Sequence, residues 1–276
     1  MAATLLVTAC AAEPSRPAGT MPSAPVVPAR LGDTLPDDPV RTVLPATGTE
    51  ARWAQGLDVF GQQVGRATTV ECARQEGIAL PRQPPVGFIR YFALPDLDFI
   101  ERHGLSESAA VPAVTAAPDP AARTGDKAAI RRCQDQGADA MSTLRAIYVP
   151  LQRAWFGEID AVRRDAKVVR AQEELPGCLT RHGFPVRDEQ AFMALGDTRM
   201  QSASATELPY IEGEMGRAYA TCMRPVEAVR EPVRLRLRTR FLTEHAAEIR
   251  ELRDKLVPVI SEAEQRHGLR LIFPVP

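Results

Sequence analysis

The 276-residue sequence lacks features that would assign it to several broad classes of protein. It has no basic excess, because 34 Lys and Arg residues stand against 35 Asp and Glu residues, whereas proteins that bind nucleic acids usually carry a strong one. No uncharged apolar stretch reaches the roughly 18 residues that a membrane-spanning helix needs. We therefore expect neither a nucleic-acid partner nor a spanning helix.

Motifs for catalysis and for cofactor binding are missing as well. The sequence contains no HExxH, GxSxG or GxGxxG motif and no phosphate-binding loop. No two cysteines occur in CxxC spacing, and we expect no histidine to join them in a zinc site. The sequence therefore predicts no catalytic residue, no metal site and no cofactor.

The first ten residues, MAATLLVTAC, carry a signal of their own. They resemble a bacterial lipobox, in which a small residue precedes the cysteine that is diacylated and becomes the mature amino terminus. Cys10 is the expected lipidation site, and two acyl chains suffice for stable membrane anchoring. No Arg or Lys precedes Cys10, so we expect the true start codon to lie upstream of Met1. The alternative is an apolar tail with a chance cysteine.

Export changes the interpretation of the other four cysteines. Thiols oxidise outside the cytoplasm, and an even number of cysteines favours disulfides, with three pairings open. The chain shows a loose two-fold echo, in which a cysteine helix and a variable loop precede a second cysteine that opens a long helix. This echo favours two bonds of about 4 kcal/mol each, namely Cys72–Cys133 and Cys178–Cys222.

The chain divides by composition into three parts. Residues 1–10 form the signal remnant, and residues 11–48 are so rich in proline that we expect an extended, disordered tether. Residues 49–276 are expected to form one helical domain of two loose halves, 49–174 and 175–276.

Apolar residues at steps of three and four predict helices through most of this domain. Residues 51–77 and 96–103 should end at glycines, and Asp96 should cap the second of these helices. Residues 233–241 alternate like a strand, but their apolar stripe continues in phase to Ile260, which favours a helix. Long helical stretches are expected over 126–174 and 212–267, and short helices near Cys178 and over 189–196.

Four prolines fall inside these helical stretches and are expected to kink or break them: Pro150, Pro225, Pro232 and Pro258. The fold class that follows is all-α, an irregular helical bundle stapled by two disulfides, behind a Pro-rich tether.

The tripeptide RHG occurs three times, at 102–104, 181–183 and 266–268. It resembles the signature of the histidine phosphatases, in which the motif follows a buried strand and the histidine becomes phosphorylated. Here each copy ends a helical stretch and precedes a hydrophobic residue, which is typical of a helix stop with a left-handed glycine. Arg and His also favour the negative end of the helix dipole. We therefore interpret RHG as a stop signal.

A run of arginines makes one segment locally basic. Such a stretch is a candidate face for an anionic partner, and its members are Arg234, Arg236, Arg238 and Arg240. Glutamates lie nearby at helical spacing, so a solvated helix face is the alternative.

From Cys72 onward the sequence resembles a group of uncharacterised actinobacterial lipoproteins and secreted proteins. The segments that carry the resemblance are ECARQEGI (71–78), DLDFIERHGL (96–105), RRCQDQGADA (131–140), GCLTRHGF (177–184) and ATCMRPVEAV (220–229) running into TEHAAEIRELR (243–253). The resemblance implies export, a helical fold and disulfides, and it brings no known activity or ligand.

These observations predict a lipid-anchored protein of the cell envelope, outside the cytoplasm. The leading hypothesis is a non-enzymatic module that binds an envelope protein or a wall component. The alternative is a small-ligand binding protein with a cavity between helices of the two halves. A histidine-phosphatase-like enzyme is the third and least favoured hypothesis.

Overall fold

A computed structural model describes residues 24–88, 90, 93–105, 109–115, 123 and 125–276. In these residues helices dominate, as the sequence predicts. The helices are α1 (Val40–Val43), α2 (Gly48–Glu76), α3 (Leu97–His103), α4 (Lys127–Ala146), α5 (Val149–Ala161), the 3-10 turn η1 (Val162–Arg164), α6 (Ala166–Glu173), α7 (Leu175–Arg181), α8 (Glu189–Ser202), α9 (Leu208–Glu244) and α10 (Ala246–His267). Strands β1 (Arg30–Gly32) and β2 (Phe273–Val275) pair antiparallel, with Arg30 opposite Val275.

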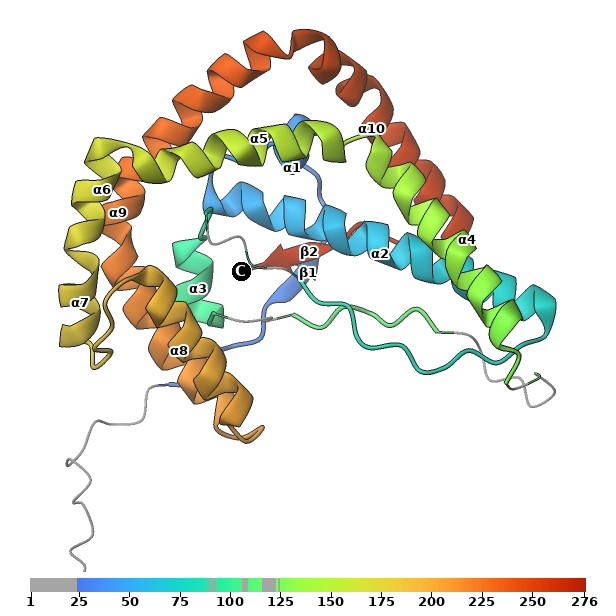
Figure 1. Ribbon diagram of the computed structural model, residues 1–276, viewed down its shortest axis with the longest axis horizontal. Coiled ribbons are helices and arrows are strands. Elements are labelled where there is room, and N and C mark those ends of the chain that lie inside the picture. Colours follow the sequence, from blue (N-terminus) through green and yellow to red (C-terminus); the bar gives the residue numbers. More distant parts are fainter. Residues whose placement is uncertain (1–23, 89, 91–92, 106–108, 116–122, 124) are drawn as a thin grey trace, which may run out of the picture.

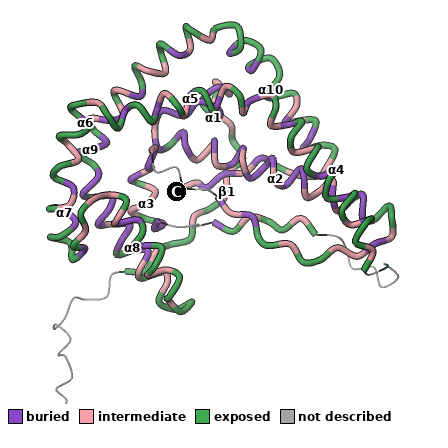
Figure 2. Tube along the Cα trace, in the orientation of Figure 1, coloured by how far each residue is buried: buried purple, intermediate pink, exposed green. Residues whose placement is uncertain are grey.

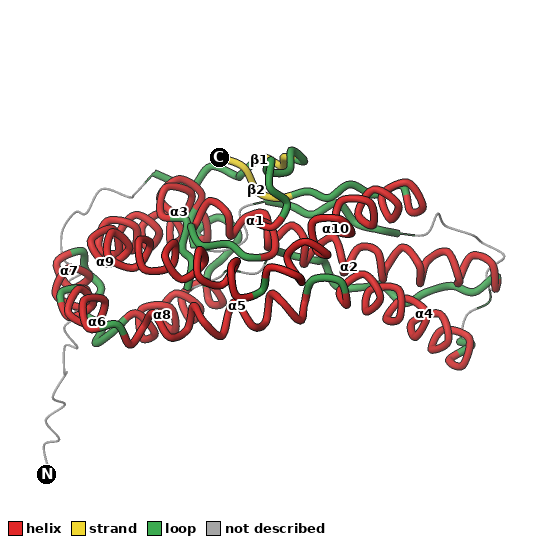
Figure 3. The backbone as a smooth tube through the Cα atoms, turned by 90° about the horizontal axis from the view of Figure 1, so that it is seen from above, coloured by secondary structure: helices red, strands yellow, loops and turns green. Residues whose placement is uncertain are grey.

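The helices form an arch over an elongated body. In Figure 1, α9 and α10 rise to a common apex, and α5 and α2 run beneath it. Viewed from above, α3, α6, α7, α8 and α9 gather at one end of the molecule, while α4 and α10 flank α2 at the other (Figure 3). None of the helices among the described residues is long and apolar enough to cross a membrane.

The two largest hydrophobic clusters among the described residues hold the arch together. The larger core combines α1, α2 and α5 with the end of α9 and with α10, and within it the rings of Trp155 and Phe241 lie 5.4 Å apart. The smaller core joins α3, α7, α8 and the first half of α9. Buried residues follow the inward faces of these helices (Figure 2). The larger core thus unites residues on both sides of position 174, so the expected division into halves 49–174 and 175–276 does not describe the packing.

The packed chain also begins earlier than we expect from composition. Val40, Val43 and Leu44 are buried in the larger core, and β1 pairs with β2. The expectation of a disordered tether over 11–48 is therefore wrong for residues 24–48, because residues of α1 are buried in the core and residues 24–32 are held by hydrogen bonds to α9 and by pairing with β2. Residues 11–23 lie outside the described part of the chain.

Local signals set the helix boundaries where the sequence places them. Thr47 caps α2 in a capping box with Glu50, and Asp96 caps α3 by accepting from the backbone N–H of Phe99. Gly77 ends α2 with a φ of 61°. All three RHG copies stand at helix ends, with positive φ at Gly104, Gly183 and Gly268, so the stop-signal interpretation is confirmed.

The prolines behave differently from expectation. Pro150 lies in the first turn of α5, where the chain does break. By contrast, α9 runs through Pro225 and Pro232, and α10 runs through Pro258, without interruption. All three are exposed, as are the residues four positions earlier whose carbonyls lose their helical partner. Water can hydrate these groups, which removes part of the penalty for a proline in a helix.

Candidate binding pocket

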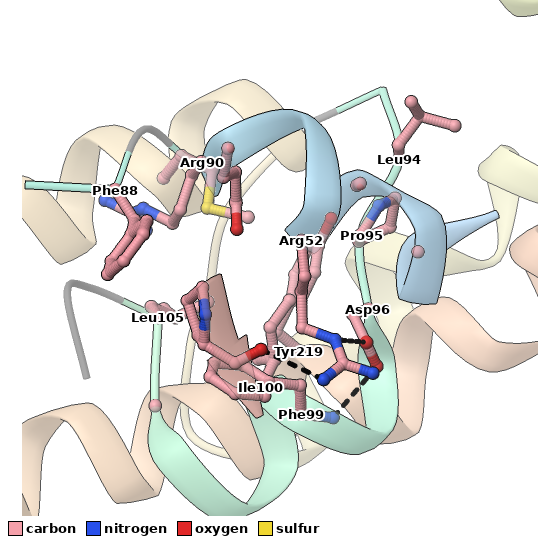
Figure 4. A pocket seen from close by; sticks show the side chains of 16 residues that line it. Arg52, Phe88, Arg90, Leu94, Pro95, Asp96, Phe99, Ile100, Leu105 and Tyr219 are labelled. Atoms are coloured by element: carbon pink, nitrogen blue, oxygen red, sulfur yellow. Dashed lines mark hydrogen bonds and ion pairs between the residues drawn. The ribbon is translucent and has the colours of Figure 1, made fainter. Parts of the chain in front are cut away.

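A narrow pocket opens where the start of α2 meets α3, α8 and α9. Its free volume is about 60 Å³. Most of its wall is apolar (Figure 4), formed by Ala51, Phe88, Leu94, Pro95, Phe99, Ile100, Leu105, Met193, Tyr219 and Pro274. Elements from residue 48 to residue 274 meet here, so the pocket exists only in the folded chain.

An ion pair fixes one edge of this pocket. Arg52 on α2 donates from Nε to Oδ2 of Asp96 at 2.8 Å, and a terminal nitrogen donates to the carbonyl of Pro274 at 3.1 Å. The guanidinium lies 5.6 Å from the centre of the Phe99 ring. Because Asp96 also caps α3, the same carboxylate orients the helix and the arginine, as the dashed lines of Figure 4 show.

Both arginines at the edge of the pocket have a carboxylate partner. Arg52 pairs with Asp96 within the lining, and Arg90 is the second arginine that lines the pocket. Arg90 reaches Asp197 outside the lining at 3.4 Å. Apolar walls with two guanidinium groups at the edge favour a ligand that carries an apolar body and a group that accepts hydrogen bonds, such as a carboxylate.

Tyr219 contributes its ring and not its hydroxyl. The hydroxyl donates to Oε1 of Glu189 at 2.6 Å. Burial, together with the neighbouring charge of Glu189, raises the pKa of Tyr219 well above its usual value, so the side chain stays neutral. The residues that line the pocket include no His, Cys, Ser or Thr, so the described lining offers groups for holding a ligand and no nucleophile paired with a base.

The four arginines predicted as one anionic-partner face are separated by the structure. Arg234 is buried, and Arg238 is largely buried and pairs with Glu50. Arg236 is exposed, and Arg240 is exposed and pairs with Glu158 at 2.6 Å. The prediction of a single face is wrong, because every second residue of a helix is turned by about 200° around its axis.

The inward arginines build a charged network inside the protein. Arg234 donates to the carbonyls of Ala46 at 2.8 Å and Ala93 at 3.1 Å and pairs with Glu227. Arg230 pairs with Glu189 at 3.1 Å and with Glu227 at 3.3 Å. The network joins α9 to the segments that precede α2 and α3. It therefore fixes the position of the chain just before Leu94, Pro95 and Asp96, which line the pocket.

Both predicted disulfides are present. Cys72 and Cys133 join α2 to α4, and Cys178 and Cys222 join α7 to α9. The sequence analysis did not predict that His182 lies beside the second disulfide. A ring nitrogen of His182 and the two sulfurs lie within 4.8 Å of one another. The signal was present in the sequence, because Cys178 and His182 are four residues apart and share one helix face.

The remaining predicted site residues are Cys10 and the histidines of the RHG motifs. Cys10 lies outside the described residues. His103 and His267 are the last residues of helices and His182 follows one, so the described chain does not place the RHG motif after a strand as in the histidine phosphatases. His103 is buried, and its Nδ1 lies 2.5 Å from the carbonyl oxygen of Val27, which ties the end of α3 to the amino-terminal segment.

No known protein family, curated protein or solved structure matches this chain. The resemblance to actinobacterial lipoproteins therefore stays a prediction.

Proposed function

We propose that this protein is a non-enzymatic binding module of the cell envelope, anchored to the membrane by lipid at Cys10, which holds a small ligand in the pocket between α2, α3 and α9. Two disulfides support a place outside the cytoplasm, since such bonds persist in oxidising compartments. The lipobox-like sequence that ends at Cys10 supports the anchor.

The pocket is the observation that carries the ligand-binding hypothesis. It combines apolar walls with an edge held by Arg52 and Asp96, the usual composition of a small-molecule site. Its free volume of about 60 Å³ is smaller than the roughly 150 Å³ cavity that accepts benzene. The buried part of the ligand is therefore a short or branched aliphatic group, and the guanidinium groups of Arg52 and Arg90 favour a carboxylate at its other end.

Calorimetric titration with short straight and branched carboxylic acids tests this site. We expect the acids to bind more tightly than their amides, and Ala51→Leu, which fills the pocket, to weaken binding at least tenfold. Ile100→Phe is a second filling variant at a half-buried position. Ala154→Leu, on the exposed face of α5, is the matched control and should bind like the parent. Equal affinity of all three variants would exclude the pocket.

The anchor is tested separately by growth with an alkyne-bearing fatty acid. The parent chain should incorporate the label and sediment with membranes, and Cys10→Ser should lose the label and appear in the aqueous fraction. Recovery of the parent only as an unlabelled chain with free thiols contradicts export.

A pull-down of the anchored protein that recovers one envelope protein equally with the parent and with Ala51→Leu favours the interaction hypothesis over the pocket.

A further inference from the structure

A cysteine pair and a histidine meet at the junction of α7 and α9. The sulfurs of Cys178 and Cys222 and a ring nitrogen of His182 all lie within 4.8 Å of one another. We propose that reduction of this disulfide creates a binding site for Zn²⁺, with two thiolates and one imidazole as ligands. This inference is independent of the pocket and of the anchor.

The geometry fits a tetrahedral ion. With Zn–S distances of about 2.3 Å, two thiolates in such a site stand about 3.8 Å apart, within reach of side-chain rotation alone. The Cα atoms of Cys178 and Cys222 are 5.6 Å apart. His182 directly follows α7 and lies one helical turn after Cys178, so both side chains project from the same side of this helix end.

Packing holds the ligands together when the disulfide is absent. Leu175 and Leu179 on either side of Cys178 are buried in the smaller core, where Tyr219 and Met223 on α9 are also buried. The two helices therefore keep their contact through apolar burial after reduction. Because the helices already hold the ligands close together, binding of the ion does not incur the entropy cost of ordering the chain.

Exposure distinguishes this disulfide from the other one. Cys178 is half-buried and His182 is exposed, whereas both Cys72 and Cys133 are buried. A reductant in solution therefore reaches Cys178 first. The same exposure leaves the fourth position of the ion open to water, as in Cys₂His zinc sites.

The reduction requires an external dithiol. One of its thiolates attacks Sγ of Cys178, the bond between the two protein sulfurs breaks, and Cys222 leaves as a thiolate. The second thiol of the reductant then displaces Cys178, and the reductant becomes a disulfide. When Zn²⁺ binds, the protons held by the two cysteines pass to solvent, and a neutral nitrogen of His182 supplies the third ligand.

The experiment uses the full chain, reduced stepwise with dithiothreitol in the absence of air. Alkylation followed by peptide mapping should label Cys178 and Cys222 before Cys72 and Cys133. After removal of the reductant, Co²⁺ should bind at one ion per chain with thiolate charge-transfer and tetrahedral absorption bands, and Zn²⁺ should displace it.

His182→Gln should lower the affinity for Co²⁺ at least tenfold without affecting the fold, because the residue is exposed at a helix end. His267→Gln is the matched control, since it changes the same RHG motif at the end of α10, and it should bind like the parent. Equal binding by His182→Gln, equal binding before reduction, or opening of both disulfides at the same reductant concentration would each overturn the proposal.

Discussion

Arg234 carries its charge at a point that water does not reach. The residue is 1% exposed, and its guanidinium contacts two backbone carbonyls and Glu227. A buried guanidinium is tolerated when its donors are occupied and a carboxylate balances it. Because Ala93 adjoins Leu94, Pro95 and Asp96 of the pocket wall, one side chain on α9 positions the edge of the candidate site.

Replacing Arg234 with alanine should therefore reduce the free energy of unfolding by about 3–5 kcal/mol, because Glu227 and two carbonyls lose a buried partner. Urea denaturation measures this loss. Arg236→Ala, two positions away and exposed, should change it by less than about 0.5 kcal/mol. If the two variants were equally stable, the inward network would not stabilise the fold.

At the scale of the element, most helix boundaries were predictable and helix continuity was not. Thr47, Asp96 and the glycines act within one turn of the chain, so their effect can be predicted from neighbouring residues. A proline in a helix leaves the carbonyl four residues earlier without its hydrogen-bond donor. Whether the helix then breaks depends on whether that carbonyl faces water or the core, which cannot be predicted from the neighbouring residues. The spacing held a clue: Pro225 and Pro232 are seven residues apart and share one face, which here faces solvent.

Pro232→Ala should raise the free energy of unfolding by about 1–3 kcal/mol, since it restores a backbone hydrogen bond inside α9 and removes a ring clash. Thermal unfolding followed by circular dichroism measures the change. Pro28→Ala, in a described segment outside any helix, is the control and should not gain stability. A loss of stability in Pro232→Ala would show that the fold depends on the proline at that position.

For the whole molecule, the sequence predicted the covalent links and not the packing. The two-fold echo identified both cysteine pairs, because it compares whole segments. The return of α10 onto α1 and α2 has no local signature, since it depends on contacts between residues about 200 positions apart, such as Arg253 with Asp38. A cavity between helices of the two halves was one of the hypotheses, but its lining could not be predicted for the same reason. Among the lining residues, Asp96 and Gly104 were singled out, as a helix cap and a helix stop.

Each disulfide should contribute about 4 kcal/mol by restricting the unfolded chain, since the bonds close loops with separations of 61 and 44 residues. We expect the double variant Cys72→Ala with Cys133→Ala to lose this amount in denaturant unfolding at equilibrium. The corresponding double variant at Cys178 and Cys222 should lose a similar amount. A loss below about 1 kcal/mol for either pair would show that core packing alone sets the stability of that helix pair.

The pairing of β1 with β2 has a mechanical consequence. It joins residues 30–32 to residues 273–275, so the two ends of the described chain lie side by side. Tension applied at residue 24 meets contacts of that segment with α9, through the carbonyl of Ala24 and the N–H of Val26, and then the strand pair. The load thus reaches α9 and the strand pair before it reaches the other helices of the arch.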